Sequence, residues 1–200
     1  MDRTQYGGSD LFDTLCTAER GINRDTLEAV VTLAVEIARE GREGRKIGTL
    51  FVVGDVEEVL RRSKDLILDP LLGHPVERKR LTDHDMRETV KELAQLDGAF
   101  IVSDDGVALS ACRYIDASSV GIRLPLGLGS RHMAAASITR QTNAVGVVVS
   151  ESSIVRVFDN GELISEIIPE IWMMSRYSLH LSGPVREKTE QQLRVVTKED

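Results

Sequence analysis

The chain has 200 residues, of which 42% are hydrophobic and 28% charged, a balance typical of one soluble globular domain. Acidic residues outnumber basic ones by 32 to 25, and this formal net charge of -7 argues against non-specific nucleic-acid binding. The apolar runs are shorter than the ~20 residues that a membrane span needs, so we expect no membrane partner. Two cysteines without C-x-x-C spacing, Cys16 and Cys112, indicate reduced thiols and a cytoplasmic location.

Hydrophobic periodicity predicts helices that alternate with strands in the first part of the chain. The clearest helix covers 24–40, where an apolar stripe follows a capping Asn23 and ends at Gly41. A strand buried on both faces is expected over 47–53, because this run is short, β-branched and nearly all apolar. After it we expect a short helix over 55–62, an irregular stretch over 63–81 and a helix that begins near Asp83 and stops at Asp97-Gly98.

Two hairpins and one further helix are predicted in the second part. A D-G pair at 105–106 and an N-G pair at 160–161 supply the positive φ that tight hairpin turns need. The remaining elements are strands over 100–103 and 107–113, a loop over 114–130, an alanine-rich helix over 131–142, strands over 145–149, 153–158 and 162–167, and a last helix over 169–177.

These elements together predict an α/β fold with a mixed central β-sheet flanked by helices. We divide the chain into an N-terminal extension over 1–22, one domain over 23–181 and a polar C-terminal tail over 182–200. The tail is rich in charged residues, so we expect it to pack loosely.

The glycine-rich stretch that leads into the alanine-rich helix carries the strongest chemical signal. Gly127 and Gly129 let the backbone approach a ligand closely, and the first N–H groups of a helix suit a phosphate. Ser130, at the expected cap, adds a hydroxyl, and Arg131 and His132 add N–H donors. The alternative is that the glycines only turn the chain and Ser130 caps the helix, since G-x-G is a common pattern.

Two carboxylates stand where predicted elements meet. Asp97-Gly98 lies at a helix-to-strand junction, where it either holds a ring or sugar close to the glycine or simply ends the helix. Ser150-Glu151 follows a buried strand directly, at the end where ligands of α/β sheets bind. This second pair either holds a phosphate and a metal or forms a solvated turn.

In order along the chain, these three pieces resemble the diadenylate cyclase domain. Its pattern is D-G-A, then G-[TS]-R-H-R, then S-E, and this chain has D-G-A at 97–99, G-S-R-H at 129–132 and S-E at 150–151. The resemblance covers residues 24–168 and is closest to the archaeal-type members. The family makes cyclic di-AMP from two ATP molecules. The resemblance therefore implies a nucleotidyltransferase in which each ATP 3′-hydroxyl attacks the α-phosphate of the other ATP, across a homodimer or higher homo-oligomer.

The resemblance also implies a role for each matched residue. Asp97, Arg131 and His132 would be catalytic, with Asp97 near the 3′-hydroxyl as a base or through a metal. Asp97 and Glu151 would bind Mn²⁺ or Mg²⁺, whose hard character suits carboxylate and phosphate oxygens. Gly98 would lie against the nucleotide, and Tyr114 would stack on adenine. The phosphates would be held by Gly129, Ser130, Arg131, His132 and Ser150.

The chain departs from the family pattern at three positions. Met133 replaces the second Arg of R-H-R, Leu96 stands where some members carry His, and Ser152 replaces the second Glu of S-E-E. Met133 is thus a substrate-binding position without its cation, which keeps open a catalytically weak or inactive nucleotide-binding module. A structural or interaction domain, whose glycines only turn the chain, would bind no nucleotide.

Overall fold

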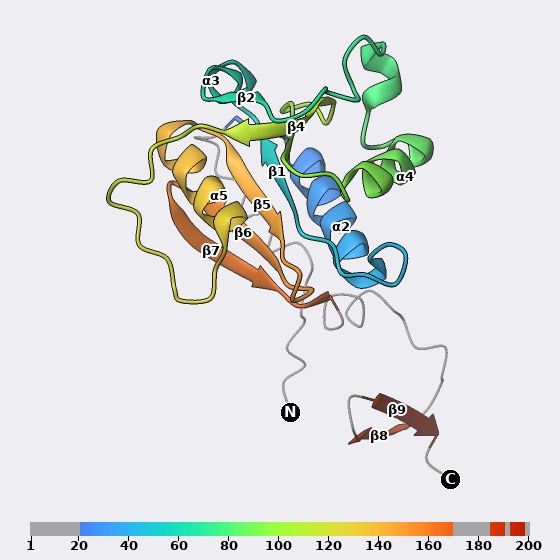
Figure 1. Cartoon of the computed structure of the whole chain (residues 1–200). Coiled ribbons are helices and arrows are strands. Elements are labelled where there is room, and N and C mark those ends of the chain that lie inside the picture. Colours follow the sequence, from blue (N-terminus) through green and yellow to red (C-terminus); the bar gives the residue numbers. More distant parts are fainter. Residues whose placement is uncertain (1–20, 170–184, 191–192, 199–200) are drawn as a thin grey trace.

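The computed structural model describes residues 21–169 and two further strands over 185–190 and 193–198 (Figure 1). Seven strands form the central sheet in the order β2-β4-β3-β1-β5-β6-β7. β1 and β3 run parallel, and every other neighbouring pair in this sheet is antiparallel. The strands are β1 (Thr49–Val53), β2 (Ser63–Asp65), β3 (Ala99–Val102), β4 (Ala108–Ile115), β5 (Val145–Val149), β6 (Val155–Asp159) and β7 (Glu162–Ile167). The predicted α/β class with a mixed sheet is confirmed.

Helices cover both faces of this sheet. α2 (Arg24–Glu40) and α4 (His84–Leu93) lie on one face, and α5 (Ser130–Gln141) lies on the other (Figure 1). Side chains of β1 alternate between the two apolar layers: Phe51 packs with α2, and Leu50 packs with α5. Because both faces are covered, every residue of β1, β3 and β5 is buried, which accounts for their nearly continuous apolar sequences. Two short helices, α3 (Val56–Arg61) and a 3-10 turn over Val76–Lys79, complete the main body.

The elements with strong local signals form as predicted. The side chain of Asn23 caps α2 by accepting a hydrogen bond from the Asp25 N–H at 2.8 Å, and Asp83 caps α4 in the same way. The predicted D-G turn joins β3 to β4, and the N-G turn joins β6 to β7. None of the described helices has the length and apolar character that crossing a membrane requires.

Three features differ from the sequence prediction. The stretch 63–81, expected to be irregular, contains β2, a three-residue polar strand that exists because it pairs with β4. Gly129 is the cap residue of α5 and Ser130 is its first helical residue, so the prediction that Ser130 caps the helix is wrong. Within the expected polar tail, β8 (Val185–Glu190) and β9 (Leu193–Lys198) form a separate two-stranded sheet. The predicted helix over 169–177 and the N-terminal extension fall almost entirely outside the described residues.

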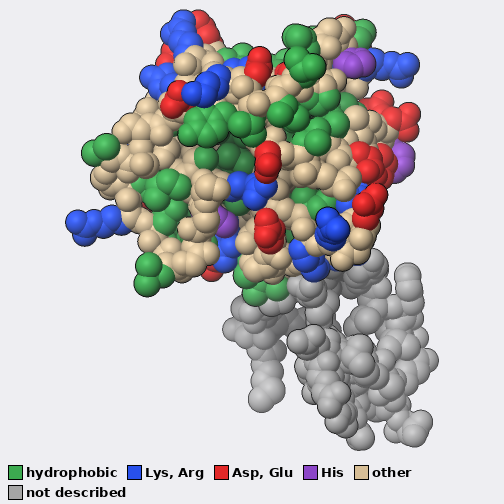
Figure 2. All heavy atoms as spheres, in the orientation of Figure 1, with side chains coloured by type: hydrophobic (Ala, Val, Ile, Leu, Met, Phe, Trp, Pro, Cys, Tyr) green, Lys and Arg blue, Asp and Glu red, His purple; other side chains and the backbone are tan. Residues whose placement is uncertain are grey.

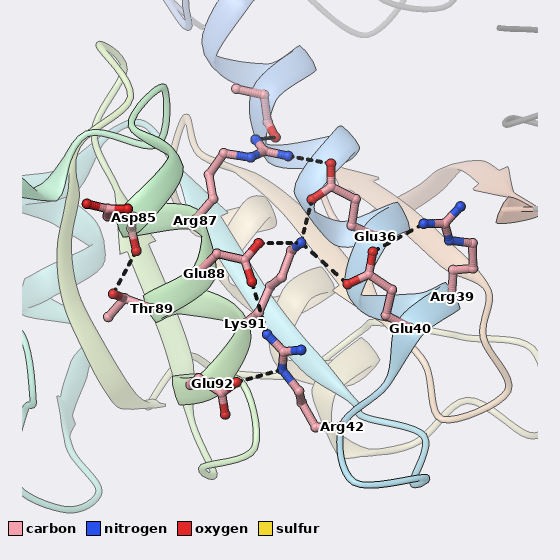
Figure 3. Close-up of polar contacts among 11 residues, drawn as sticks. Glu36, Arg39, Glu40, Arg42, Asp85, Arg87, Glu88, Thr89, Lys91 and Glu92 are labelled. Carbon is pink, nitrogen blue, oxygen red and sulfur yellow. Dashed lines mark hydrogen bonds and ion pairs between the residues drawn. The ribbon is translucent and has the colours of Figure 1, made fainter. Parts of the chain in front are cut away.

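A cluster of charged side chains joins α2 to α4 (Figure 3). The side chain of Lys91 is only 9% exposed, and its ammonium nitrogen lies 2.8 Å from a Glu88 oxygen, 3.0 Å from Glu36 and 3.4 Å from Glu40. Arg87 pairs with the same Glu36 at 2.7 Å. Burial by itself lowers the pKa of Lys91, but its bonds to Glu88 and Glu36 outweigh this effect, and the pKa lies above its ordinary value. The cluster therefore keeps a charged lysine between the two helices.

Candidate active site

The strand order brings two distant carboxylates to one edge of the sheet. Asp97 lies just before β3, and Glu151 lies just after β5. Since β1 runs parallel to β3 and antiparallel to β5, the start of β3 and the end of β5 flank the start of β1. We expected a ligand at the carboxyl end of the 145–149 strand. Ser150 and Glu151 do follow the carboxyl end of β5. However, β5 is antiparallel to β1, so this edge of the sheet is the amino end of the parallel strands β1 and β3.

Arg131, the second residue of α5, lies between these two carboxylates. One guanidinium nitrogen of Arg131 is 3.1 Å from Asp97 Oδ1, and the other is 3.6 Å from Glu151 Oε1. The side chains of Asp97 and Glu151 are 81% and 73% exposed, whereas that of Arg131 is 32% exposed. Exposed ion pairs of this kind are weak, so a ligand oxygen can replace either carboxylate at the guanidinium.

A cavity of about 320 Å³ opens beside Asp97 and Arg131. Tyr114, Gly98 and Ser130 also line it. The remaining lining is mostly apolar and comes from Leu50, Leu66, Ala99, Arg113, Ile115 and Ala134. Hydrophobic side chains gather near the middle of one molecular face, next to both acidic and basic ones (Figure 2). A cavity of this character suits a flat, largely apolar ring.

A second cavity of about 360 Å³ shares Ser130 and Arg131 with the first. It is lined by Gly48, Gly127, Gly129, Ser130, Arg131, His132, Val149, Ser150 and Glu151. A Cβ atom at Gly127 or Gly129 would meet nothing within 4 Å, so these glycines leave open space at the start of α5. Backbone groups at a helix start, together with an arginine and hydroxyls, suit an anion such as a phosphate.

Gly98 is required by the protein's own backbone. Its φ is +109°, and a Cβ atom there would lie 2.5 Å from the backbone carbonyl carbon of Cys112 in β4. Gly98 also lines the first cavity. However, the close approach of β4 is enough to exclude a side chain, whether or not a nucleotide is bound.

Tyr114 lies at the first cavity with a cation already over its ring. The Lys64 ammonium is 5.0 Å from the ring centroid, because Lys64 and Tyr114 are opposite each other in the β2–β4 ladder. Tyr114 is about half exposed, so the predicted stacking on adenine has accessible surface.

His132 is buried at the edge of the second cavity. It is only 6% exposed, and its Nε2 lies 3.3 Å from a guanidinium nitrogen of Arg156. Burial, and then the charges of Arg156 and Arg131, lower the pKa of His132 below its ordinary value. These surroundings therefore favour the neutral form of His132.

Ser150 and Met133 have different positions relative to the site. The Ser150 hydroxyl accepts hydrogen bonds from the hydroxyl and the N–H of Ser152, at 2.9 and 3.3 Å, which leaves its own hydrogen available for a ligand in the second cavity. Met133 is half-buried and lines neither of the two cavities. All other predicted site residues line at least one of them.

Three residues at or beside the site were not predicted from the sequence: Gly48, Arg113 and Arg156. Gly48 and Arg113 each line one of the cavities, and Arg156 contacts His132. A Cβ atom at Gly48 would lie 3.1 Å from an Arg131 nitrogen, so this glycine makes room for the guanidinium. A glycine at the start of an apolar strand signals a close approach of this kind. A charged residue inside the apolar run of β6 is the corresponding signal for Arg156.

Asp97 and Glu151 have the oxygen donors that Mn²⁺ and Mg²⁺ prefer. Within residues 21–169, no group of three or more His, Cys, Asp and Glu side chains is arranged to hold a metal. An ion held by these two carboxylates would therefore need its other ligands from water and from a bound phosphate, as Mg²⁺ usually takes them.

Comparison with known proteins identifies the family. The family model described as DisA bacterial checkpoint controller nucleotide-binding, or DAC, matches residues 36–163, more than half of the chain. The chain belongs to the DAC family. A diadenylate cyclase from Methanocaldococcus jannaschii is 45% identical over 161 residues, which are 80% of this chain and 50% of that protein. A diadenylate cyclase from Haloferax volcanii is 41% identical over 174 residues, 86% of this chain and 61% of that protein.

This DAC chain thus spans between 50% and 61% of the length of these relatives. A solved structure from Bacillus cereus, described as a hypothetical membrane spanning protein, is similar with a TM-score of 0.52 at 19% identity. The match covers 69% of this chain and 61% of that one. At this identity the likeness concerns the fold alone, and it agrees with the mixed sheet described above.

Proposed function

We propose that this chain is a diadenylate cyclase, which condenses two ATP molecules into cyclic di-AMP and two pyrophosphates. One observation carries the proposal. Arg131 lies between two exposed carboxylates at the point where a largely apolar cavity meets a glycine-lined one. The two curated relatives bear the name of this activity.

The two cavities match the two parts of ATP. Adenine and ribose would occupy the apolar cavity, with Tyr114 beside the base and Asp97 near the ribose. The triphosphate would lie in the second cavity, against the start of α5, where Arg131, Ser130 and Ser150 donate to phosphate oxygens. Arg131 lines both cavities, so it would contact the phosphates close to the ribose.

The reaction is a phosphoryl transfer that depends mainly on positioning and charge neutralisation. The 3′-hydroxyl oxygen of one ATP forms a bond to the α-phosphorus of the other, and the bond to pyrophosphate breaks. Asp97 would take the hydroxyl proton and pass it to water, which its exposure allows. Arg131 would stabilise the negative charge that develops on the α-phosphate. The same exchange on the other ATP closes the ring.

A divalent metal and a second copy of the chain complete the proposal. When bound, Mn²⁺ or Mg²⁺ would neutralise phosphate charge, and Asp97 and Glu151 are the residues that would hold it. One copy of the site holds one ATP, so closing the ring needs a second copy, in a homodimer or higher homo-oligomer. The exposed Leu126, next to Gly127, offers apolar surface beside the site for such a contact. We also propose a cytoplasmic location and ATP, not nucleic acid, as the partner.

A second candidate is a nucleotide-binding module with little or no turnover. Met133 favours it, because the cation that the family pattern places there is absent. The two candidates differ in their products, because only the cyclase forms cyclic di-AMP.

Purified protein would be incubated with ATP and Mn²⁺, in parallel with EDTA, and the products analysed by mass spectrometry. Metal-dependent cyclic di-AMP and pyrophosphate would support the cyclase. Bound ATP without product would favour the binding module.

A further inference from the structure

Three side chains from three elements form a hydrogen-bonded chain behind the second cavity. His132 of α5 faces Arg156 of β6, with 3.3 Å between Nε2 and a guanidinium nitrogen. The Nε of Arg156 donates to Glu166 of β7 at 2.6 Å, and these two residues are opposite each other in the β6–β7 ladder. Arg156 is only 9% exposed, so its charge is held largely inside the protein.

The donors and acceptors of this chain allow only one arrangement. A guanidinium group carries N–H donors and no acceptor, so Arg156 must donate to His132. Nε2 of His132 must then be the bare, accepting nitrogen, and the proton of the neutral ring must be on Nδ1. A doubly protonated ring would instead set two donors and two positive charges against each other at 3.3 Å.

The groups around His132 affect whether its ring carries a positive charge. Arg131 on α5 and Arg156 on β6 oppose a positive charge on the ring, as does burial, while Glu166 on β7 and the Gly129 backbone favour it. Nδ1 is itself buried, and it makes no hydrogen bond of normal geometry in the described part of the chain. The N–H on Nδ1 therefore lies beside the backbone of Gly129, the last residue of the glycine loop.

We propose that Arg156, oriented by Glu166, is a positioning residue that fixes His132 as the neutral Nδ1–H tautomer. The ring then presents its N–H toward the loop that ends at Gly129 and steadies that loop against the bound triphosphate. The effect on ATP rests on the proposed function, whereas the tautomer does not.

The tautomer is measured directly by nitrogen NMR of the imidazole rings. The chain has four histidines, and loss of one signal in His132→Gln assigns His132. In the wild type we expect a single neutral tautomer with the proton on Nδ1. In Arg156→Met the ring loses its donor, so the two tautomers mix and the pKa of His132 rises. An Nε2–H tautomer in the wild type, or an unchanged ring in Arg156→Met, would overturn the proposal.

Two further variants keep the test decisive if Arg156→Met does not fold. Glu166→Gln keeps an acceptor for Arg156 but removes a negative charge, so the tautomer should stay the same and the pKa of His132 should fall. A rise in that pKa would contradict the proposed chain of contacts. Arg140→Met, at the other end of α5, removes an exposed arginine as a matched control and should change neither property.

Kinetics separate this proposal from the cyclase proposal. Arg156→Met should raise the KM for ATP about 10-fold, the lower end of what losing the outer partner of a metal ligand costs, with a smaller change in kcat. Arg156→Lys should restore part of this loss, because it keeps a charged donor. If the NMR results hold but no variant makes cyclic di-AMP, the cyclase proposal fails and the positioning role stands. If turnover is normal but Arg156→Met leaves KM unchanged, the positioning role fails.

Discussion

Two regions of this molecule combine cations with carboxylates and use them differently. Between α2 and α4, the nearly buried Lys91 is surrounded by three carboxylates (Figure 3). At the sheet edge, the more exposed Arg131 lies between two carboxylates that are mostly in solvent. The first cluster lies within packed helices, whereas the second borders two cavities.

The difference shows how burial decides what an ion pair can do. Around Lys91, three carboxylates contact the ammonium group. A ligand that displaced one of them would leave a poorly hydrated carboxylate without its cation, which is unfavourable. Around Arg131, solvated carboxylates give up their partner at little cost, and a phosphate can take the guanidinium. The first arrangement stabilises the fold, and the second is able to exchange partners. The following experiments test this contrast.

Asp97→Asn should have the largest effect, on activity alone. The amide cannot accept the hydroxyl proton, so synthesis of cyclic di-AMP should fall about 10³-fold, within the range typical of a lost general base. ATP binding should stay largely intact. Product formation and ATP affinity would be measured by mass spectrometry and calorimetry. Glu92→Gln, which removes a carboxylate that pairs with Arg42 near the buried cluster, is the matched control and should retain turnover. Wild-type turnover in Asp97→Asn would refute the role given to Asp97.

Arg131→Ala should weaken ATP binding about 10- to 100-fold. The variant removes a charge-assisted contact to phosphate worth about 1.5–3 kcal/mol. Because its two carboxylate partners are exposed, they remain hydrated and the fold should keep its stability. Calorimetric titration with ATP checks the affinity, and urea unfolding checks the stability. An unchanged ATP affinity would remove Arg131 from the site.

Lys91→Met should show the opposite pattern. Three carboxylates would be left close together without their cation, so the free energy of unfolding should fall by about 1–3 kcal/mol. ATP affinity should be unchanged, since the cluster lines neither cavity. Urea unfolding and calorimetry provide both measurements. A loss of ATP binding at full stability would show that the two charged regions are coupled.

The stability difference between wild type and Lys91→Met should also depend on pH. The pKa of Lys91 is raised above its ordinary 10.5, so its stabilising effect is present below that pH and disappears as the pH rises through the folded value. The hydrogen bond from Lys91 lowers the pKa of Glu88 below its ordinary 4.5. The contribution of Glu88 to stability therefore disappears as the pH falls through its folded pKa. Unfolding curves should therefore show the widest gap between these limits. A gap that does not vary with pH would mean that packing, not charge, explains the loss.

Met133→Arg should have the smallest effect. Met133 lines neither cavity, so a new cation there should change ATP affinity within one chain by less than about threefold, below the usual value of a charged hydrogen bond. Calorimetry against the wild type measures this. A tenfold gain would instead show that this position reaches a phosphate in the assembled protein.

Much of the fold could be predicted from local sequence signals. The capping side chains of Asn23 and Asp83, and the D-G and N-G turns, act on neighbouring residues, so their patterns can be read without tertiary information. The order D-G-A, G-S-R-H and S-E likewise located half of the residues that line the two cavities. By contrast, β2 has no apolar periodicity and exists only through pairing with β4, about 50 residues further along the chain, so no local pattern predicts it.

The sequence by itself therefore determined the elements, the turns and the chemical types of the site residues. Tertiary structure alone decided where those residues meet, because the antiparallel pairing of β5 with β1 sets Glu151 beside Asp97 and Arg131. It also decided that the Cys112 backbone leaves no room for a side chain at Gly98, that Met133 is outside both cavities and that Arg156 contacts His132. The physical reason is the same in each case: these contacts join residues far apart in the chain, and strand pairing and helix packing bring them together.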